Sequence, residues 1–233
     1  MTDQVQSINT SGFGSGIAQQ ERNRVLRNTY WLLTLSLIPT VLGAWLGVST
    51  GITKAVMGGW MGMIVFLGGA FAFMYAIQKT KNSAAGVPVL LGFTFFMGLM
   101  LAGLIERTLG FKNGPSLIMT AFGGTAGVFF VMASLASVIK RDLSGLGKWL
   151  FVGAVVLMIG SVIGILVGSS AAMIAVSVAA IGIFSAYMLY DLKQIIDGGE
   201  TNYISATLSL YLDIFNVFQS LLALLGIFGG ERD

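Results

Sequence analysis

Long apolar segments alternate with short polar turns along almost the whole chain. Seven such segments follow a polar stretch at residues 1–28, and most of them approach the roughly 20 residues that a helix needs to cross a bilayer. The pattern therefore predicts an all-α integral membrane protein with seven transmembrane helices. Their expected bounds are 29–48, 55–78, 86–105, 115–139, 146–168, 171–196 and 203–228.

The polar stretch and the basic residues predict the domains and the topology. Residues 1–28 are rich in Ser, Gly, Gln and Asn and lack the early apolar region of a signal peptide. We predict a flexible cytoplasmic tail at 1–28 and one seven-helix membrane domain at 29–233. With the tail inside, nine of the 13 basic residues fall on the cytoplasmic side, which places the C-terminus outside; they are Arg22, Arg24, Arg27, Lys79, Lys81, Lys140, Arg141, Lys148 and Lys193.

Composition excludes several classes of function. Only 10% of the residues are charged, against about 25% in a typical soluble domain. The absence of Cys and His removes disulfides, thiolate and imidazole metal sites, and nucleophiles activated by histidine. The net charge of +3 is scattered through loops, which argues against a nucleic-acid partner. We expect no enzyme and no cofactor beyond transported or regulatory ions, and the sequence leaves the oligomeric state open.

The last two segments each carry one aspartate inside an apolar run. Asp191 lies roughly 8 Å, and Asp213 roughly 15 Å, from the predicted inner face, at 1.5 Å of rise per residue. The two helices are antiparallel neighbours across the short turn at 197–202, so these carboxylates can approach each other. Ionisable side chains at such depth are costly and mark functional sites.

A polar stripe supports this interpretation. Asp213 shares an arc of about 80° on the last helix with other polar residues, and in a membrane such a stripe faces the bundle interior or a water-filled cavity. On the preceding helix, Tyr187 and Gln194 flank Asp191. The alternative, that these groups only hydrogen-bond helices together, remains open. The other members of the stripe are Ser205, Ser209, Asn216 and Ser220.

Two carboxylates in one low-dielectric site do not both ionise readily. Asp191 and Asp213 therefore hold one proton between them or bind a cation, transient calcium included, which predicts a pH sensor or gate. Lys79 and Lys81, at the inner end of the second segment, are candidate latch partners in a closed state; the alternative is ordinary anchoring by positive charge at the inner face. Intramembrane aspartyl proteolysis is a further alternative. Tyr190–Asp191 matches half of its signature, but the GxGD half is missing at Asp213.

Small residues four positions apart recur on four of the predicted helices. Such pairs let neighbouring backbones approach closely. Because the pairs are spread over several helices, we interpret them as packing within the bundle and not as a dimer motif. They are Gly43/Gly47, Gly58/Gly62, Gly123/Gly127, Gly160/Gly164 and Gly164/Gly168.

Several segments carry a family resemblance. The run Ala206–Asp213, the YDL at Tyr190–Leu192 and the seven-segment layout resemble the Bax inhibitor-1 (TMBIM) family. Residues 25–30 (VLRNTY) and 198–204 (GGETNYI) look most like its bacterial YccA-like branch. The resemblance implies a six-helix bundle around a central C-terminal helix, in the inner membrane of a bacterium.

The resemblance implies two functions. In the calcium-leak members of the family a di-aspartyl pair acts as pH sensor and latch, and it maps onto Asp191 and Asp213. Those members carry a latch arginine where this chain reads AIQKTKN, so Lys79 or Lys81 would have to replace it. The bacterial branch implies instead a modulator of the membrane AAA protease FtsH that is also a substrate recognised through its tail, without conduction.

Overall fold

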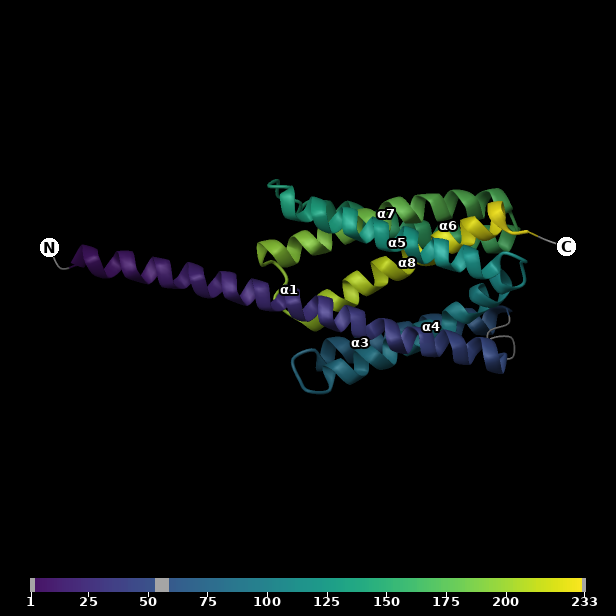
Figure 1. The fold of residues 1–233 in the computed structure, drawn as a ribbon, viewed down its shortest axis with the longest axis horizontal. Coiled ribbons are helices and arrows are strands. Elements are labelled where there is room, and N and C mark those ends of the chain that lie inside the picture. The colour runs from purple at the N-terminus through teal and green to yellow at the C-terminus, as the bar shows by residue number, and fades with distance from the viewer. Residues whose placement is uncertain (1–2, 53–58, 232–233) are drawn as a thin grey trace.

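The computed structural model describes residues 3–52 and 59–231, and these residues contain helices and no strand. Consecutive helices run in opposite directions along one common axis, and the two ends of the chain lie at opposite ends of this axis (Figure 1). The elements are α1 (Asp3–Thr50), α3 (Gly59–Thr80), α4 (Gly86–Leu109), α5 (Gly114–Val138), α6 (Leu146–Val167), α7 (Ser170–Asp197) and α8 (Tyr203–Gly229).

The structure confirms an all-α membrane protein. Each of the seven predicted segments corresponds to a helix, and six contain a stretch long and apolar enough to span a bilayer. The seventh helix, α3, contains a shorter apolar segment, Ile64–Thr80. The predicted start of that segment at 55–58 lies outside the described residues. Large apolar side chains cover the outer surface, among them Trp149 and Phe130 at 76% and 68% exposure. This outward apolar surface is what a lipid-facing bundle requires.

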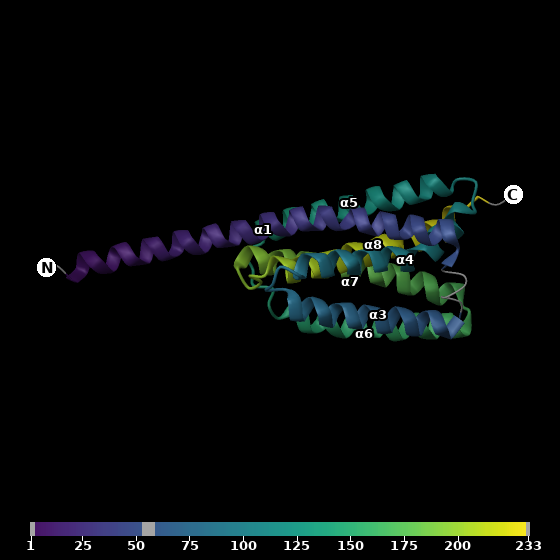
Figure 2. The ribbon, with the colours of Figure 1, turned by 90° about the horizontal axis from the view of Figure 1, so that it is seen from below.

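The segment expected to be a flexible tail is helical from Asp3 onward. It continues the first span without a break, so α1 projects well beyond the bundle (Figures 1 and 2). The division into a tail and a membrane domain at residue 28 stays a prediction.

The C-terminal helix α8 packs against α1, α3, α4, α5 and α7. It lies between α1 and α5 on one side and α3 and α6 on the other (Figure 2). Leu210, Tyr211, Val217 and Leu222 of α8 are at most 1% exposed. The core is therefore organised along α8, while α6 packs on α7.

Glycines allow the closest helix crossing, between α1 and α4. A Cβ atom added at Gly43 would collide with the carbonyl oxygen of Phe95, and one added at Gly98 would collide with that of Thr40. Gly43 belongs to a predicted pair, whereas its counterpart Gly98 was not predicted. The crossing explains why α1 and α4 share the most extensive helix–helix contact in the bundle.

The other predicted glycine pairs divide into confirmed and wrong. Gly160 and Gly164 of α6 face Val176 and Ala172 of α7, as packing within the bundle predicts. Gly168 has φ +65 and lies just after the end of α6, with open space beside it. The prediction of packing within the bundle is therefore wrong for Gly168. It is also wrong for the α5 pair at 123 and 127, which faces open space because α5 turns its 117–121–125 face to the interior. Gly58 lies outside the described residues.

Substituting Gly98 with alanine is expected to destabilise the protein by at least the 1–3 kcal/mol typical of about one added methyl in a tight core, because the methyl meets backbone that cannot rotate away. Gly123→Ala is the matched control. Its methyl enters open space, and alanine favours a helix over glycine by roughly 0.5–1 kcal/mol. Thermal unfolding of both variants in detergent checks the prediction, and equal melting temperatures would contradict it.

Candidate functional site

The site is built on the hairpin of α7 and α8. Gly198 ends α7 with φ +82, a left-handed conformation that glycine adopts without strain. Asn202 begins α8, and its side-chain oxygen accepts hydrogen bonds of 3.0 Å from the backbone N–H groups of Ile204 and Ser205. The end of α7 and the start of α8 are therefore both capped within a few residues, and the two helices pack side by side.

This hairpin brings Asp191 and Asp213 together. Their carboxyl groups lie within hydrogen-bonding reach of each other. A hydrogen bond between two carboxyl groups requires a proton on one of them. Asp213 is only 4% exposed, and Asp191 is partly buried. Asp213 Oδ2 has no hydrogen-bond partner within the described part of the chain. A proton shared with Asp191, a water molecule or a cation would satisfy this buried oxygen.

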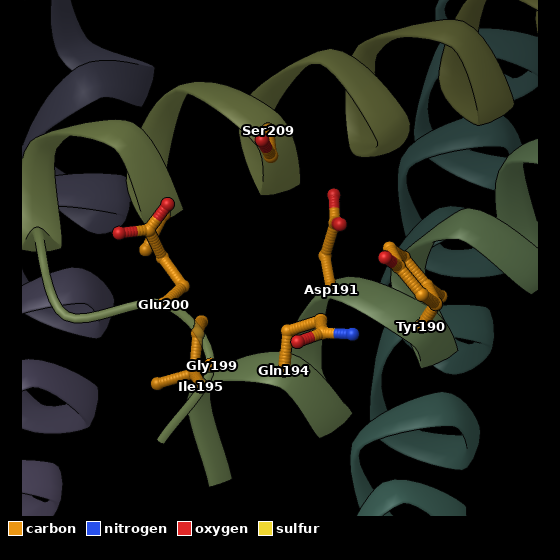
Figure 3. A pocket seen from close by; sticks show the side chains of 8 residues that line it. Tyr190, Asp191, Gln194, Ile195, Gly199, Glu200 and Ser209 are labelled. Atoms are coloured by element: carbon orange, nitrogen blue, oxygen red, sulfur yellow. The ribbon is translucent and has the colours of Figure 1, made fainter. Parts of the chain in front are cut away.

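A pocket of about 240 Å³ opens beside the pair. Figure 3 shows the Asp191 carboxyl pointing from α7 toward α8, with Ser209 on α8 above it and Glu200 on the connecting loop. Oxygen and amide groups thus gather at one opening next to the buried carboxyls. The lining residues are Tyr190, Asp191, Gln194, Ile195, Gly199, Glu200, Ala206 and Ser209.

The predicted polar stripe on α8 divides into two parts. Ser209 lines the pocket, and the buried Ser205 Oγ, one turn before it, has no hydrogen-bond partner among the described residues. Asn216 instead donates to the Leu212 carbonyl of its own helix, at 2.7 Å, and the half-buried Ser220 lies one turn further on. Of the stripe, Ser209 therefore belongs to the pocket, and the Asn216 bond does not join helices.

Groups on α7 complete the surroundings of the pair. Tyr187 lies close enough to both aspartates to feel their charge, and its ring stacks on Phe184 with 6.0 Å between centroids. Gln194 lines the pocket, as its position on the face of Asp191 predicts. Within the described residues, no group of three or more acidic side chains is arranged to hold a metal ion. Two carboxyls that no third acidic side chain joins in a metal-binding group suit transient binding of a hard cation more than tight binding.

The two candidate latch lysines lie at the end of α3 and just beyond it. The Lys79 ammonium lies 5.5 Å from the centre of the Tyr75 ring, an arrangement that attracts a cation. In the described residues no ion pair joins Lys79 or Lys81 to either aspartate. A lysine latch therefore remains a prediction for another state of the protein.

The structure adds one residue that the sequence did not assign to the site. The Asn202 amide donates to the carbonyl of Lys81 at 3.1 Å and to Asn82 Oδ1 at 2.8 Å, across 121 and 120 residues of sequence. Asn202 N–H also donates to Glu200 at 2.7 Å. Asn202 thus fastens the first turn of α8 to the α3–α4 loop and holds Glu200 at the pocket.

Tyr211 holds the middle of α8. It is 1% exposed, and its hydroxyl shares a 2.8 Å hydrogen bond with the Thr40 hydroxyl of α1. A longer bond of 3.4 Å reaches the Thr94 carbonyl of α4. Its isolated position in an apolar run gave no sign of these partners.

A charge cluster closes the same end of the bundle. Lys193 of α7 forms an ion pair with Asp197 at 2.6 Å. Hydrogen bonds from the backbone and hydroxyl of Ser144 lower the pKa of Asp142 in the α5–α6 loop, and Lys193 contributes to the same shift. Lys193 is therefore already balanced by carboxylates outside the pocket.

The helical bundle, its apolar surface and the paired buried carboxyls define an integral membrane protein with a polar site inside it. Residues 22–230 match the family model described as inhibitor of apoptosis-promoting Bax1. The chain belongs to the Bax inhibitor-1 family.

Bacterial relatives agree over nearly the full length. The chain is 38% identical over 204 residues to the modulator of FtsH protease YccA of Escherichia coli K12, covering 88% of this chain and 90% of that protein. It is 35% identical over 207 residues to a membrane protein of Vibrio cholerae, covering 89% and 91%. A protein of Pseudomonas aeruginosa is 36% identical over 218 residues, covering 93% and 96%. The resemblance to the YccA-like bacterial branch is thereby confirmed.

Proposed function

We propose that the protein is a pH-sensitive leak for calcium or other cations, gated by Asp191 and Asp213. One observation carries the proposal: two carboxyl groups inside membrane helices lie within hydrogen-bonding reach of each other beside an open pocket. Burying such a pair in an apolar environment costs free energy, and ionisable residues within membrane helices therefore mark functional sites. Proton uptake or cation binding follows directly from this geometry.

The gating mechanism follows from the number of protons on the pair. With one proton, the hydrogen bond holds α7 to α8; with none, two negative charges within hydrogen-bonding reach repel each other strongly at low dielectric. A cation entering from the pocket replaces the proton as the neutralising charge. Each change alters the force between the two helices at this end of the bundle.

The moving element is α8, which we propose as the central seventh helix, surrounded by a bundle of the other six. Its contacts with five other helices support this role. Lys79 or Lys81 would pair with the aspartates only after a rearrangement of the α3–α4 loop. We further propose a bacterial inner-membrane location with the N-terminus in the cytoplasm, supported by the basic residues gathered at the pocket end of the bundle.

Calcium entry into proteoliposomes tests the proposal. The purified chain is reconstituted with a trapped calcium indicator, and entry rates are measured over a pH series against protein-free vesicles. The expected result is entry above that background, with a rate that changes with pH. Rates equal to the background at every pH would refute conduction.

A second function is supported by the relative named as a modulator of FtsH protease and by the projecting helix of α1. In this alternative the chain engages the membrane AAA protease FtsH through residues 1–28 and conducts nothing. Deleting residues 2–20 is expected to lengthen the half-life of the chain several-fold in cells that contain the protease. Cells without the protease are the control, and an unchanged half-life in the first cells would remove the tail as a handle.

A further inference from the structure

A groove lies where α1 enters the bundle, beside the first residue of α8. It has a volume of about 370 Å³ and is lined by Asn28, Trp31, Leu32, Leu35 and Tyr203. Leu32 is 5% exposed, whereas Trp31 is 73% exposed. The groove therefore has a floor in the protein core and opens outward.

The position of the groove determines what reaches it. Its α1 residues belong to the candidate membrane-spanning helix Gln19–Thr50, and Trp and Tyr are the residues that concentrate at the level of lipid headgroups. The groove is thus at the edge of the hydrocarbon layer, at the N-terminal end of the bundle. Lipid acyl chains surround the groove there, so the polar residues of the groove decide which lipid headgroup it favours.

Three residues of the groove carry groups that can donate hydrogen bonds. Asn28 carries an amide NH₂, Trp31 an indole N–H and Tyr203 a hydroxyl. None of these three is hydrogen-bonded through its side chain within the described residues, and no acidic side chain lines the groove. This set favours a ligand with oxygen acceptors above an apolar tail.

Two arginines supply positive charge next to these donors. Arg24, Asn28, Trp31 and Leu35 follow each other at spacings of four, three and four, which places them on one face of α1. Arg27 lies four residues before Trp31 on the same side, and both arginines are exposed. Arg22 points elsewhere, against Gly198 of the α7–α8 loop.

We propose that this groove binds an anionic phospholipid of the leaflet at the N-terminal end. One acyl chain lies along Leu32 and Leu35 between the rings of Trp31 and Tyr203. The phosphate is held by Arg24 and Arg27, with Asn28 donating to its oxygens. The site is independent of the aspartate pair and of the proposed conduction.

Native mass spectrometry of the full chain, released from detergent after incubation with lipid, tests the proposal. Wild-type protein is expected to retain phosphatidylglycerol several-fold more than phosphatidylcholine. Arg24→Gln with Arg27→Gln is expected to lower this preference by about fivefold per arginine, the effect of one cationic side chain at an anionic surface. Tyr203→Phe, which removes only the hydroxyl, is expected to give a smaller decrease.

Arg22→Gln is the matched control, because it removes the same charge from the same helix but not from the groove. Melting temperatures without lipid identify any variant that fails to fold. Equal retention of both lipids by the wild-type chain would overturn the proposal. So would an equal loss in Arg22→Gln, which would indicate bulk charge, or full displacement of the lipid by free glycerol 3-phosphate.

Discussion

Replacing Asp213 with asparagine is expected to abolish the pH dependence of cation entry while the protein remains folded. Asparagine has the shape of aspartate, and its amide donates a hydrogen bond to Asp191 without carrying a proton that can leave. The 4% exposed position therefore keeps its packing and its bond but loses its titration. Wild-type rates are expected to change by up to about tenfold per pH unit, the limit for a single proton, and the variant's rates to stay flat.

The measurement is the same proteoliposome assay, repeated over the pH series with three variants. Asp191→Asn changes the less buried partner and is expected to give the same flat profile. Asp197→Asn is the control, because it removes a carboxylate from the same helix end that is paired with Lys193 outside the pocket. A pH profile unchanged in Asp213→Asn, or flattened equally by Asp197→Asn, would contradict gating by the pair.

The sequence was sufficient to predict the helices and to bring the two aspartates together, because both follow from local pattern. The length of each apolar segment predicts the membrane spans. The turn between α7 and α8 is so short that the two helices have to lie side by side. Helical spacing then gives the depth and the face of Asp191 and Asp213. The rotation of each helix about its axis was harder to predict, because on α5, which is apolar on most sides, contact with α7 and α8 selects which small residues face inward.

The remaining features depend on contacts between distant parts of the chain. The Asn before α8 is a recognisable N-cap, but its bonds across 121 residues to Lys81 have no local signal. Tyr211 lies in an apolar run, and its partner Thr40 is 171 residues away. In residues 1–28 the local composition and the structure differ: Gly12, Gly14 and Gly16 disfavour a helix, yet α1 continues through them.

Replacing Asn202 with alanine is expected to cause a large loss of stability, because one side chain makes two kinds of contact. Loss of the cap on α8 costs about 1 kcal/mol, and each of the two bonds to the α3–α4 loop contributes roughly 1 kcal/mol more. The sum, about 3 kcal/mol, corresponds to a decrease in melting temperature of several degrees. Thermal unfolding in detergent measures it.

Asn202→Ser separates the two contributions, because serine caps a helix as well as asparagine but lacks the amide that reaches Lys81 and Asn82. We expect its melting temperature to fall between those of the wild type and Asn202→Ala; equality with the wild type would mean that the bonds to Lys81 and Asn82 contribute nothing.

The same variants relate stability to the proposed gate. Among the described residues, the loop that carries Lys81 is joined to α8 by the Asn202 side chain and not by an ion pair. If that tie restrains α8, Asn202→Ser raises calcium entry at the pH where wild-type entry is lowest, whereas Gly98→Ala, which weakens α1–α4 packing instead, does not.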